Sequence, residues 1–217
     1  MVVRYPGKTI LLVITALLFL VPCAGADEKV VFSWGFFLKS ADGLVKSLDF
    51  DGPESVGKGD LLRVYLQLHE KSYVYVFLYD SRKDLYQVFP PSPDFYGHAF
   101  PAWQKYYIPS AREWFTLDGS PGVEKFFILA ANNRLMDIEE LAGKVIFERK
   151  EGAVDEKAVE IIEKKAAAIS DPQSVSIDPV HVAHTAKLGP LNPGEGVTAN
   201  RVVANGSYGL VLELVNR

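Results

Sequence analysis

The stretch that decides the fold is residues 61–89, LLRVYLQLHEKSYVYVFLYDSRKDLYQVF. Apolar residues occupy every second position from Leu62 to Leu68, which is typical of a strand with one buried face. Residues 73–79 are apolar or aromatic on both faces, so we expect a central strand that is covered on each side. A polar turn at 80–83 then leads into a further strand at 84–89. Together these residues predict an antiparallel β-sheet.

The same signals extend along the chain in both directions. Residues 46–50 predict another strand. We expect one hairpin over 112–131, with its turn at 118–122, where glycine and proline are concentrated. We expect a second, C-terminal hairpin over 199–216, because Asn205-Gly206 between two apolar runs is a strong short-range hairpin signal.

Two helices are expected beside these strands. Apolar residues recur at helical spacing over 154–170, with charged residues on the opposite face. Asp137 can cap a shorter helix over 138–143, with Glu140 at the capping-box position. Residues 171–198 contain four prolines and several glycines, so we expect a surface loop or linker there. The predicted fold is mainly β, an antiparallel β-sandwich with one or two peripheral α-helices.

Residues 1–26 have the three parts of a secretory signal peptide. Two basic residues precede an apolar run at 10–21, and cleavage is expected after Ala26. A retained membrane anchor and a lipoprotein acylated at Cys23 are the alternatives. Cleavage would leave 27–217 as one β-rich domain, periplasmic or secreted, with no membrane span.

The composition excludes several kinds of site from this exported domain. The whole chain has 23 basic and 27 acidic residues, a formal net charge of −4. Loss of the two basic residues of the signal peptide would leave the mature chain at −6 without a basic patch, which argues against nucleic acid as a partner. Cys23 is the chain's only cysteine, so iron–sulfur and zinc–thiolate sites are excluded after cleavage. No motif predicts a cofactor.

One pair of residues has metal-ligand chemistry. His181 and His184 are three residues apart and could share a metal ion if they lay on a helix. Pro179 and Gly189 favour a loop instead, and the spacing fixes no third ligand. We therefore predict no metal site. His181 and His184 remain the two residues whose positions would test this prediction.

An aromatic cluster is the best candidate for a binding surface. Its members lie in or beside a proline-rich connection between two expected strands. They are Phe95, Tyr96, Trp103, Tyr106 and Tyr107. Aromatic side chains give a large contact area at low entropic cost and can stack on sugars or hold a peptide. The alternative is that they fold back and cover an open end of the sandwich.

The middle of the chain also carries a specific order of short motifs. They are Gly59-Asp60-Leu61-Leu62, Tyr73-Val74-Tyr75-Val76-Phe77, Leu85-Tyr86-Gln87-Val88-Phe89-Pro90, Ile108-Pro109, Gly122-Val123-Glu124 and Leu129-Ala130-Ala131. In this order they resemble the bacterial family called domain of unknown function number forty-three eighty-four, over about residues 44–143. Members of that family occur in exported proteins and beside protein kinases and caspase-like peptidases. The resemblance implies a β-sandwich accessory domain and supplies no catalytic residue.

These observations favour a non-catalytic binding or scaffolding module of the bacterial cell envelope, with an unidentified protein or glycan as its partner. The alternative is an envelope hydrolase acting on glycan or peptide, whose carboxylates would come from distant strands. A pocket with convergent carboxylates would favour the enzyme. An aromatic patch or an open sheet edge would favour the module.

Overall fold

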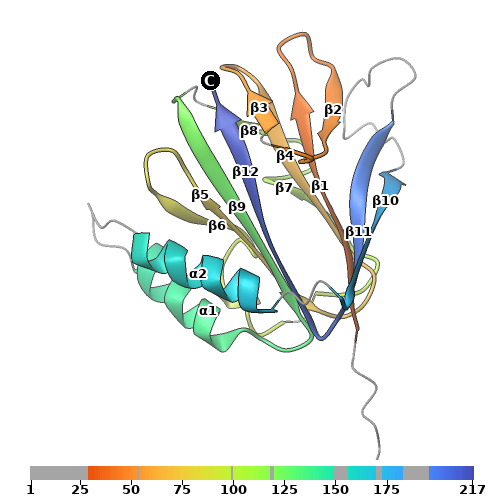
Figure 1. The fold of residues 1–217 in the computed structure, drawn as a ribbon, viewed down its shortest axis with the longest axis vertical. Helices are drawn as coiled ribbons and strands as arrows, with labels where there is room; N and C mark the ends of the chain where they lie inside the picture. Colours follow the sequence, from red (N-terminus) through yellow and green to blue (C-terminus); the bar gives the residue numbers. More distant parts are fainter. Residues whose placement is uncertain are drawn as a thin grey trace, which may run out of the picture.

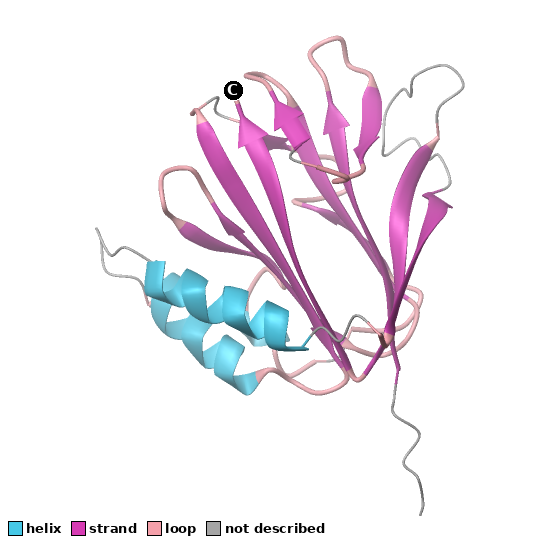
Figure 2. Ribbon diagram, in the orientation of Figure 1, coloured by secondary structure: helices cyan, strands magenta, loops and turns pink. Residues whose placement is uncertain are grey.

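The computed structural model describes residues 29–52, 54–98, 100–117, 120–148, 156–169, 173–182 and 196–217. These residues form two β-sheets packed face to face, with two helices on the outer face of one sheet (Figure 1 and Figure 2). The prediction of a mainly β, antiparallel sandwich with peripheral helices is confirmed. The expected signal peptide at 1–26 lies outside the described residues. None of the described helices has the length and hydropathy that crossing a bilayer requires.

The first sheet, sheet A, contains seven strands in antiparallel ladders. Its main order is β10–β11–β1–β4–β7, with β2 paired to β1 and β8 paired to β4. Its strands are β1 (Lys29–Lys39), β2 (Val45–Leu48), β4 (Leu61–Leu68), β7 (Lys105–Ile108), β8 (Phe115–Thr116), β10 (Val175–Val182) and β11 (Val197–Asn205).

The second sheet, sheet B, has the order β3–β12–β9–β5–β6, and all its ladders are antiparallel except that of β3 with β12. Its strands are β3 (Glu54–Val56), β5 (Tyr73–Tyr79), β6 (Leu85–Phe89), β9 (Gly122–Ala131) and β12 (Ser207–Asn216). Helices α1 (Met136–Ala142) and α2 (Glu156–Ile169) lie against its outer face (Figure 1). A π-helical turn over Gly143–Phe147 follows α1, and a short 3-10 helix covers Pro93–Phe95.

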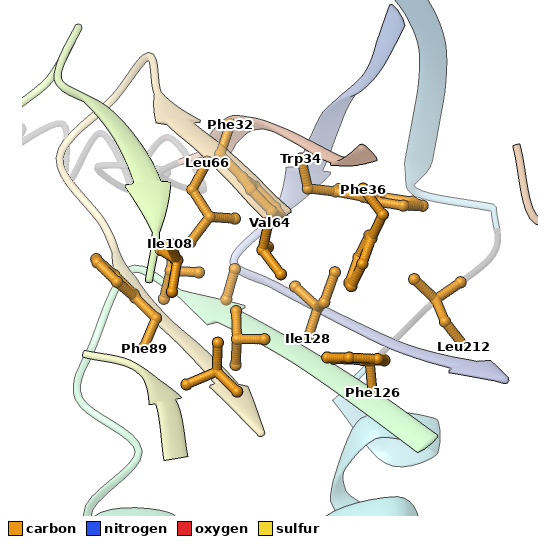
Figure 3. Close-up of a cluster of buried hydrophobic side chains, with 14 of the residues drawn as sticks. Phe32, Trp34, Phe36, Val64, Leu66, Phe89, Ile108, Phe126, Ile128 and Leu212 are labelled. Atoms are coloured by element: carbon orange, nitrogen blue, oxygen red, sulfur yellow. The ribbon is translucent and has the colours of Figure 1, made fainter. Parts of the chain in front are cut away.

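The main core fills the space between the two sheets, and Figure 3 shows side chains from both sheets meeting there. Phe36 of β1 contacts Phe126 of β9 edge-on, with ring centroids 4.8 Å apart. The predicted alternation in β4 is confirmed, since the apolar residues at alternate positions from Leu62 to Leu68 all face this core. Burial of this apolar surface is the main favourable contribution to folding.

A second core lies between sheet B and the helices, and β5 contributes to both cores. Val74 and Val76 face the main core, whereas Tyr75 and Phe77 pack beneath the helices. The prediction that 73–79 forms a central strand covered on each side is therefore confirmed.

Both predicted hairpins that follow residue 110 are wrong, because their strands belong to different sheets. Asn205-Gly206 joins β11 of sheet A to β12 of sheet B, with Gly206 at a φ of 73° that suits glycine. Similarly, β8 pairs with β4 in sheet A, while β9 pairs with β5 and β12 in sheet B. The turn residues specify a reversal of the chain, but the pairing partner depends on contacts that are distant in sequence.

The loop predicted for 171–198 is wrong in part, because residues 175–182 form β10. Pro179 is tolerated in this strand because β10 is at the edge of sheet A, where a missing N–H breaks no ladder. His181 lies on β10 and is exposed, whereas His184 lies outside the described residues.

The N-terminus of α1 also differs from the prediction. Leu135, rather than Asp137, occupies the N-cap position. Asp137 lies in the first turn, where it forms a 2.7 Å ion pair with Lys165 of α2. Glu140 pairs with Lys144 one turn later instead of closing a capping box. The Asp137–Lys165 pair therefore links α1 to α2, and neither acid occupies the N-cap of α1.

Candidate binding site

One side of the sandwich is open. In the described part of the chain, sheet B ends at β6 and sheet A ends at β7 and β8 on this side. A cavity of about 1010 Å³ opens between these two edges and takes its lining from both sheets. Its aromatic lining includes Tyr86, Phe89, Phe95, Phe100, Tyr106 and Phe115. A cavity of this size can hold a small ligand or several side chains of a partner.

The inner wall of the cavity is a packed group of aromatic rings. The centroid of Phe89 lies 4.6 Å from that of Phe100 and 5.1 Å from that of Tyr106. Phe95 stacks on Phe100 at 6.3 Å and is 44% exposed at the mouth. Because these rings hold one another in place, the wall is preorganised and a ligand need not order it on binding.

Charged side chains surround the apolar wall. Asp80 is buried, and its Oδ1 accepts hydrogen bonds from the backbone N–H groups of Arg82 and Asp84 at 3.0 and 2.8 Å. The Arg82 guanidinium lies 3.3 Å from Oδ2 of the same carboxylate, so this pair stabilises the β5–β6 turn. Glu124 of β9 is buried at the cavity, and Lys105 of β7 lies at its mouth. Such a polar rim can orient a mainly apolar ligand.

The structure divides the predicted aromatic cluster among three places. Phe95, Tyr106 and Tyr107 all border the cavity. Tyr107 also packs against Tyr65 on the outer face of sheet A, with ring centroids 5.4 Å apart. The other two members of the cluster, Tyr96 and Trp103, do not line the cavity.

Tyr96 belongs to the second core rather than to a surface. Its hydroxyl donates a hydrogen bond to Oε1 of Gln87, and its ring lies 6.1 Å from that of Tyr75. Burial raises the pKa of Tyr96 to about 12. Trp103, by contrast, is 70% exposed and lies beside His69, away from the cavity.

Sequence reasoning missed the buried guanidinium of Arg63. This side chain is 1% exposed on the outer face of sheet A. Its Nη2 and Nε donate to the backbone carbonyl of Glu113 at 2.7 and 3.1 Å, and its guanidinium carbon lies 4.0 Å from the centre of the Trp114 ring. The strand pattern predicted only that Arg63 faces away from the main core, and no signal in the sequence indicated a partner for it.

The described residues contain no group of three or more histidine, cysteine, aspartate or glutamate side chains that could hold a metal ion. The cavity itself offers an apolar, aromatic surface with carboxylate, guanidinium and ammonium groups around it. This arrangement suits recognition of an apolar group that carries polar or charged neighbours.

Comparison with known families identifies the part of the chain that builds this site. Residues 55–134 match the family model described as domain of unknown function (DUF4384). The DUF4384 match confirms the resemblance found in the sequence and contains β4 to β9 entirely. All residues that line the cavity fall within it. No curated protein and no solved structure matches the chain.

Proposed function

We propose that this protein is a non-catalytic binding module that acts outside the bacterial cytoplasm, in the cell envelope. The observation that supports this proposal is the cavity of about 1010 Å³ between the edges of the two sheets, with its preorganised aromatic wall. Every residue that lines the cavity belongs to the DUF4384 segment. The cavity is therefore built by that segment rather than by the strands and helices that precede or follow it in the sequence.

The chemistry of the lining indicates the kind of partner. Aromatic rings form much of the wall, and charged groups stand around it, which matches the apolar centre and polar rim of a protein interface. We infer that a partner protein inserts one or more apolar side chains between β6 and β7. Asp80, Arg82 and Lys105 would then meet polar groups at the rim of the contact.

Site-specific photo-crosslinking tests this proposal. A benzoylphenylalanine in place of Tyr86, which is 38% exposed at the cavity, should capture the partner in intact cells. The same probe in place of Phe147, which is 41% exposed and outside the cavity, is the matched control and should not.

A blocking variant makes the test specific for the cavity. Ala111 lines the cavity, so Ala111→Trp should fill part of it and abolish the crosslink from position 86. Ala41→Trp, at an exposed turn, should leave the crosslink unchanged. Equal crosslinks from positions 86 and 147, or a crosslink that survives Ala111→Trp in a folded protein, would overturn the proposal.

Export is the second part of the proposal, and the mass of the mature protein tests it. Signal peptidase cleavage after Ala26 predicts a chain that begins at Asp27 in the periplasm or the medium. A diacylated chain that begins at Cys23 would instead place the protein on a membrane leaflet, and an uncleaved chain in the cytoplasm would refute export.

A further inference from the structure

A row of polar side chains crosses the outer face of sheet A. Its members are direct cross-strand neighbours on β10, β11, β1, β4 and β7, and such neighbours share one face of a sheet. In spatial order they are Asp178, Arg201, Ser33, Gln67 and Lys105. Ser33 is buried, Gln67 is half-buried, and the other three are exposed. No described helix covers this face.

Trp103 stands next to this row. It is 70% exposed, and its backbone has a φ of 66°, a left-handed conformation that tryptophan rarely adopts. Its N–H donates to the carbonyl of Leu68 at 2.6 Å, which fixes the backbone. A strained residue that presents a large ring to solvent is a reason to suspect function.

His69 connects the tryptophan to the row. Its ring lies edge-on to Trp103 with centroids 5.2 Å apart, and its Nε2 lies 2.8 Å from Oγ of Ser33. Burial lowers the pKa of His69, and the nearby positive charges of Arg201 and Lys105 lower it further. The negative charge of Glu70 raises this pKa and offsets part of the decrease. The imidazole of His69 therefore contacts both the tryptophan ring and Ser33 of the row.

The row offers both donors and acceptors. Oε1 of Gln67 accepts a 2.7 Å hydrogen bond from the Tyr65 hydroxyl, which leaves the amide nitrogen to donate outward. Arg201 and Lys105 form no ion pair within the part of the chain that the structure describes. Asp178 accepts from the Ser176 hydroxyl at 2.9 Å and keeps further acceptor capacity.

We propose that Trp103 and the row from Lys105 to Asp178 form a glycan-binding surface. A pyranose ring has a face of C–H groups, which stacks on an aromatic ring, and a rim of hydroxyl groups, which needs donors and acceptors in alternation. The exposed indole supplies the first requirement, and the amide, guanidinium, ammonium and carboxylate groups supply the second. This surface lies on the outer face of sheet A, away from the aromatic wall of the cavity, and shares Lys105 with the cavity mouth. It takes a different kind of ligand and so goes beyond the proposed function.

Titration of the mature chain with defined oligosaccharides tests this inference. The probes are cellohexaose, chitohexaose and soluble peptidoglycan glycan strands, followed by calorimetry and by tryptophan emission. Trp103→Ala should weaken binding about tenfold or more, because it removes the aromatic ring at the centre of the contact. Gln67→Ala and Arg201→Gln should weaken it less, and Phe147→Ala should not change it.

Two further variants test whether a loss of saccharide binding comes from unfolding and whether the cavity contributes to binding. Trp103→Gly should weaken binding as much as Trp103→Ala without lowering the melting temperature, because glycine adopts a positive φ freely. Ala111→Trp, which blocks the cavity, should bind saccharide normally. The inference is overturned if none of the three probes binds at millimolar concentration, if Trp103→Ala binds as well as the wild type, or if only a peptide binds at Trp103.

Discussion

The phenolic oxygen of Tyr75 lies 2.5 Å from Oε1 of Glu139, and this hydrogen bond joins β5 to α1. Both side chains are buried. The backbone N–H of Leu135, at the N-cap of α1, donates to the same phenolic oxygen at 3.3 Å. Arg134 pairs with Glu139 from the more exposed side. Tyr75 therefore satisfies the backbone N–H of the N-cap residue from the sheet, a role that the side chain at N3 has in a capping box.

Tyr75→Phe should lower the free energy of unfolding by about 1.5–3 kcal/mol, since it removes a hydrogen bond to a buried charged group and leaves the Leu135 N–H unpaired. Urea denaturation would measure this loss. Tyr106→Phe is the matched control, because the Tyr106 hydroxyl forms no hydrogen bond within the described residues. If both variants have the same free energy of unfolding, the hydrogen bonds that link β5 to α1 do not stabilise the protein.

The sequence predicted the positions of the strands better than it predicted which strands pair with each other. Alternation in β4 and the two-sided apolar pattern of β5 identify a half-buried and a fully buried strand, because side chains of a strand alternate between its faces. Asn205-Gly206 predicted a turn correctly but a hairpin wrongly. Local turn chemistry cannot tell whether two strands pair or cross between layers, since that choice depends on which distant apolar faces they cover.

The candidate site was only partly predictable for a similar reason. Phe95 and Tyr106 line the cavity as members of a cluster found by composition, whereas Phe89 lines it from a strand whose pattern predicts only burial. Tyr96 lies in the same proline-rich connection yet packs into the second core. Composition identifies an aromatic cluster, but the fold decides which rings point into a cavity and which into a core.

Gly209 of β12 lies directly against the backbone of Ala166 in α2. A Cβ atom at this position would overlap the backbone of Ala166. Gly209→Ala should therefore displace α2 and lower the free energy of unfolding by about 1–3 kcal/mol, the usual result of overpacking. Gly97→Ala, where a Cβ atom meets nothing within 4 Å, should change stability by less than about 0.5 kcal/mol. Thermal unfolding of the two variants would show whether the difference exists.

Buried tyrosines should make the protein sensitive to alkali. Burial raises the pKa of Tyr208 to about 12, although Trp34 lowers this pKa by a smaller amount. Burial also raises the pKa of Tyr96 to about 12. In the unfolded chain these groups titrate near 10.0. The stability that the neutral phenols contribute is thus complete below pH 10 and is lost as the pH rises toward 12, because only the unfolded state releases protons in this range.

The expected slope is a loss of up to about 1.4 kcal/mol per pH unit for each such tyrosine. Urea denaturation at several values from about pH 8 to about pH 11 would measure it. Tyr208→Phe should reduce the slope, because phenylalanine has no proton to lose. A slope that is the same in the wild type and in this variant would contradict the assignment.

Arg63 holds the loop at the mouth of the cavity. Its guanidinium donates twice to the carbonyl of Glu113, and the Ser110 hydroxyl accepts from the backbone N–H groups of Arg112 and Glu113 at 3.2 and 3.0 Å. Ala111 in the middle of this loop lines the cavity. Arg63→Met keeps most of the side-chain volume but removes both hydrogen bonds and the contact of the cation with Trp114.

Arg63→Met should therefore lower the free energy of unfolding by about 2–4 kcal/mol, the combined loss of a charged hydrogen bond and a cation–π contact in a buried site. Arg63→Lys should recover only part of this, because an ammonium group lacks the planar fork that meets the carbonyl and the indole together. Hydrogen exchange gives the decisive readout. Amides of residues 110–115 should exchange faster in Arg63→Met under native conditions, while those of β5 and β9 keep the protection set by global unfolding. If the loop exchanges as slowly as in the wild type, Arg63 stabilises sheet A without positioning the cavity mouth.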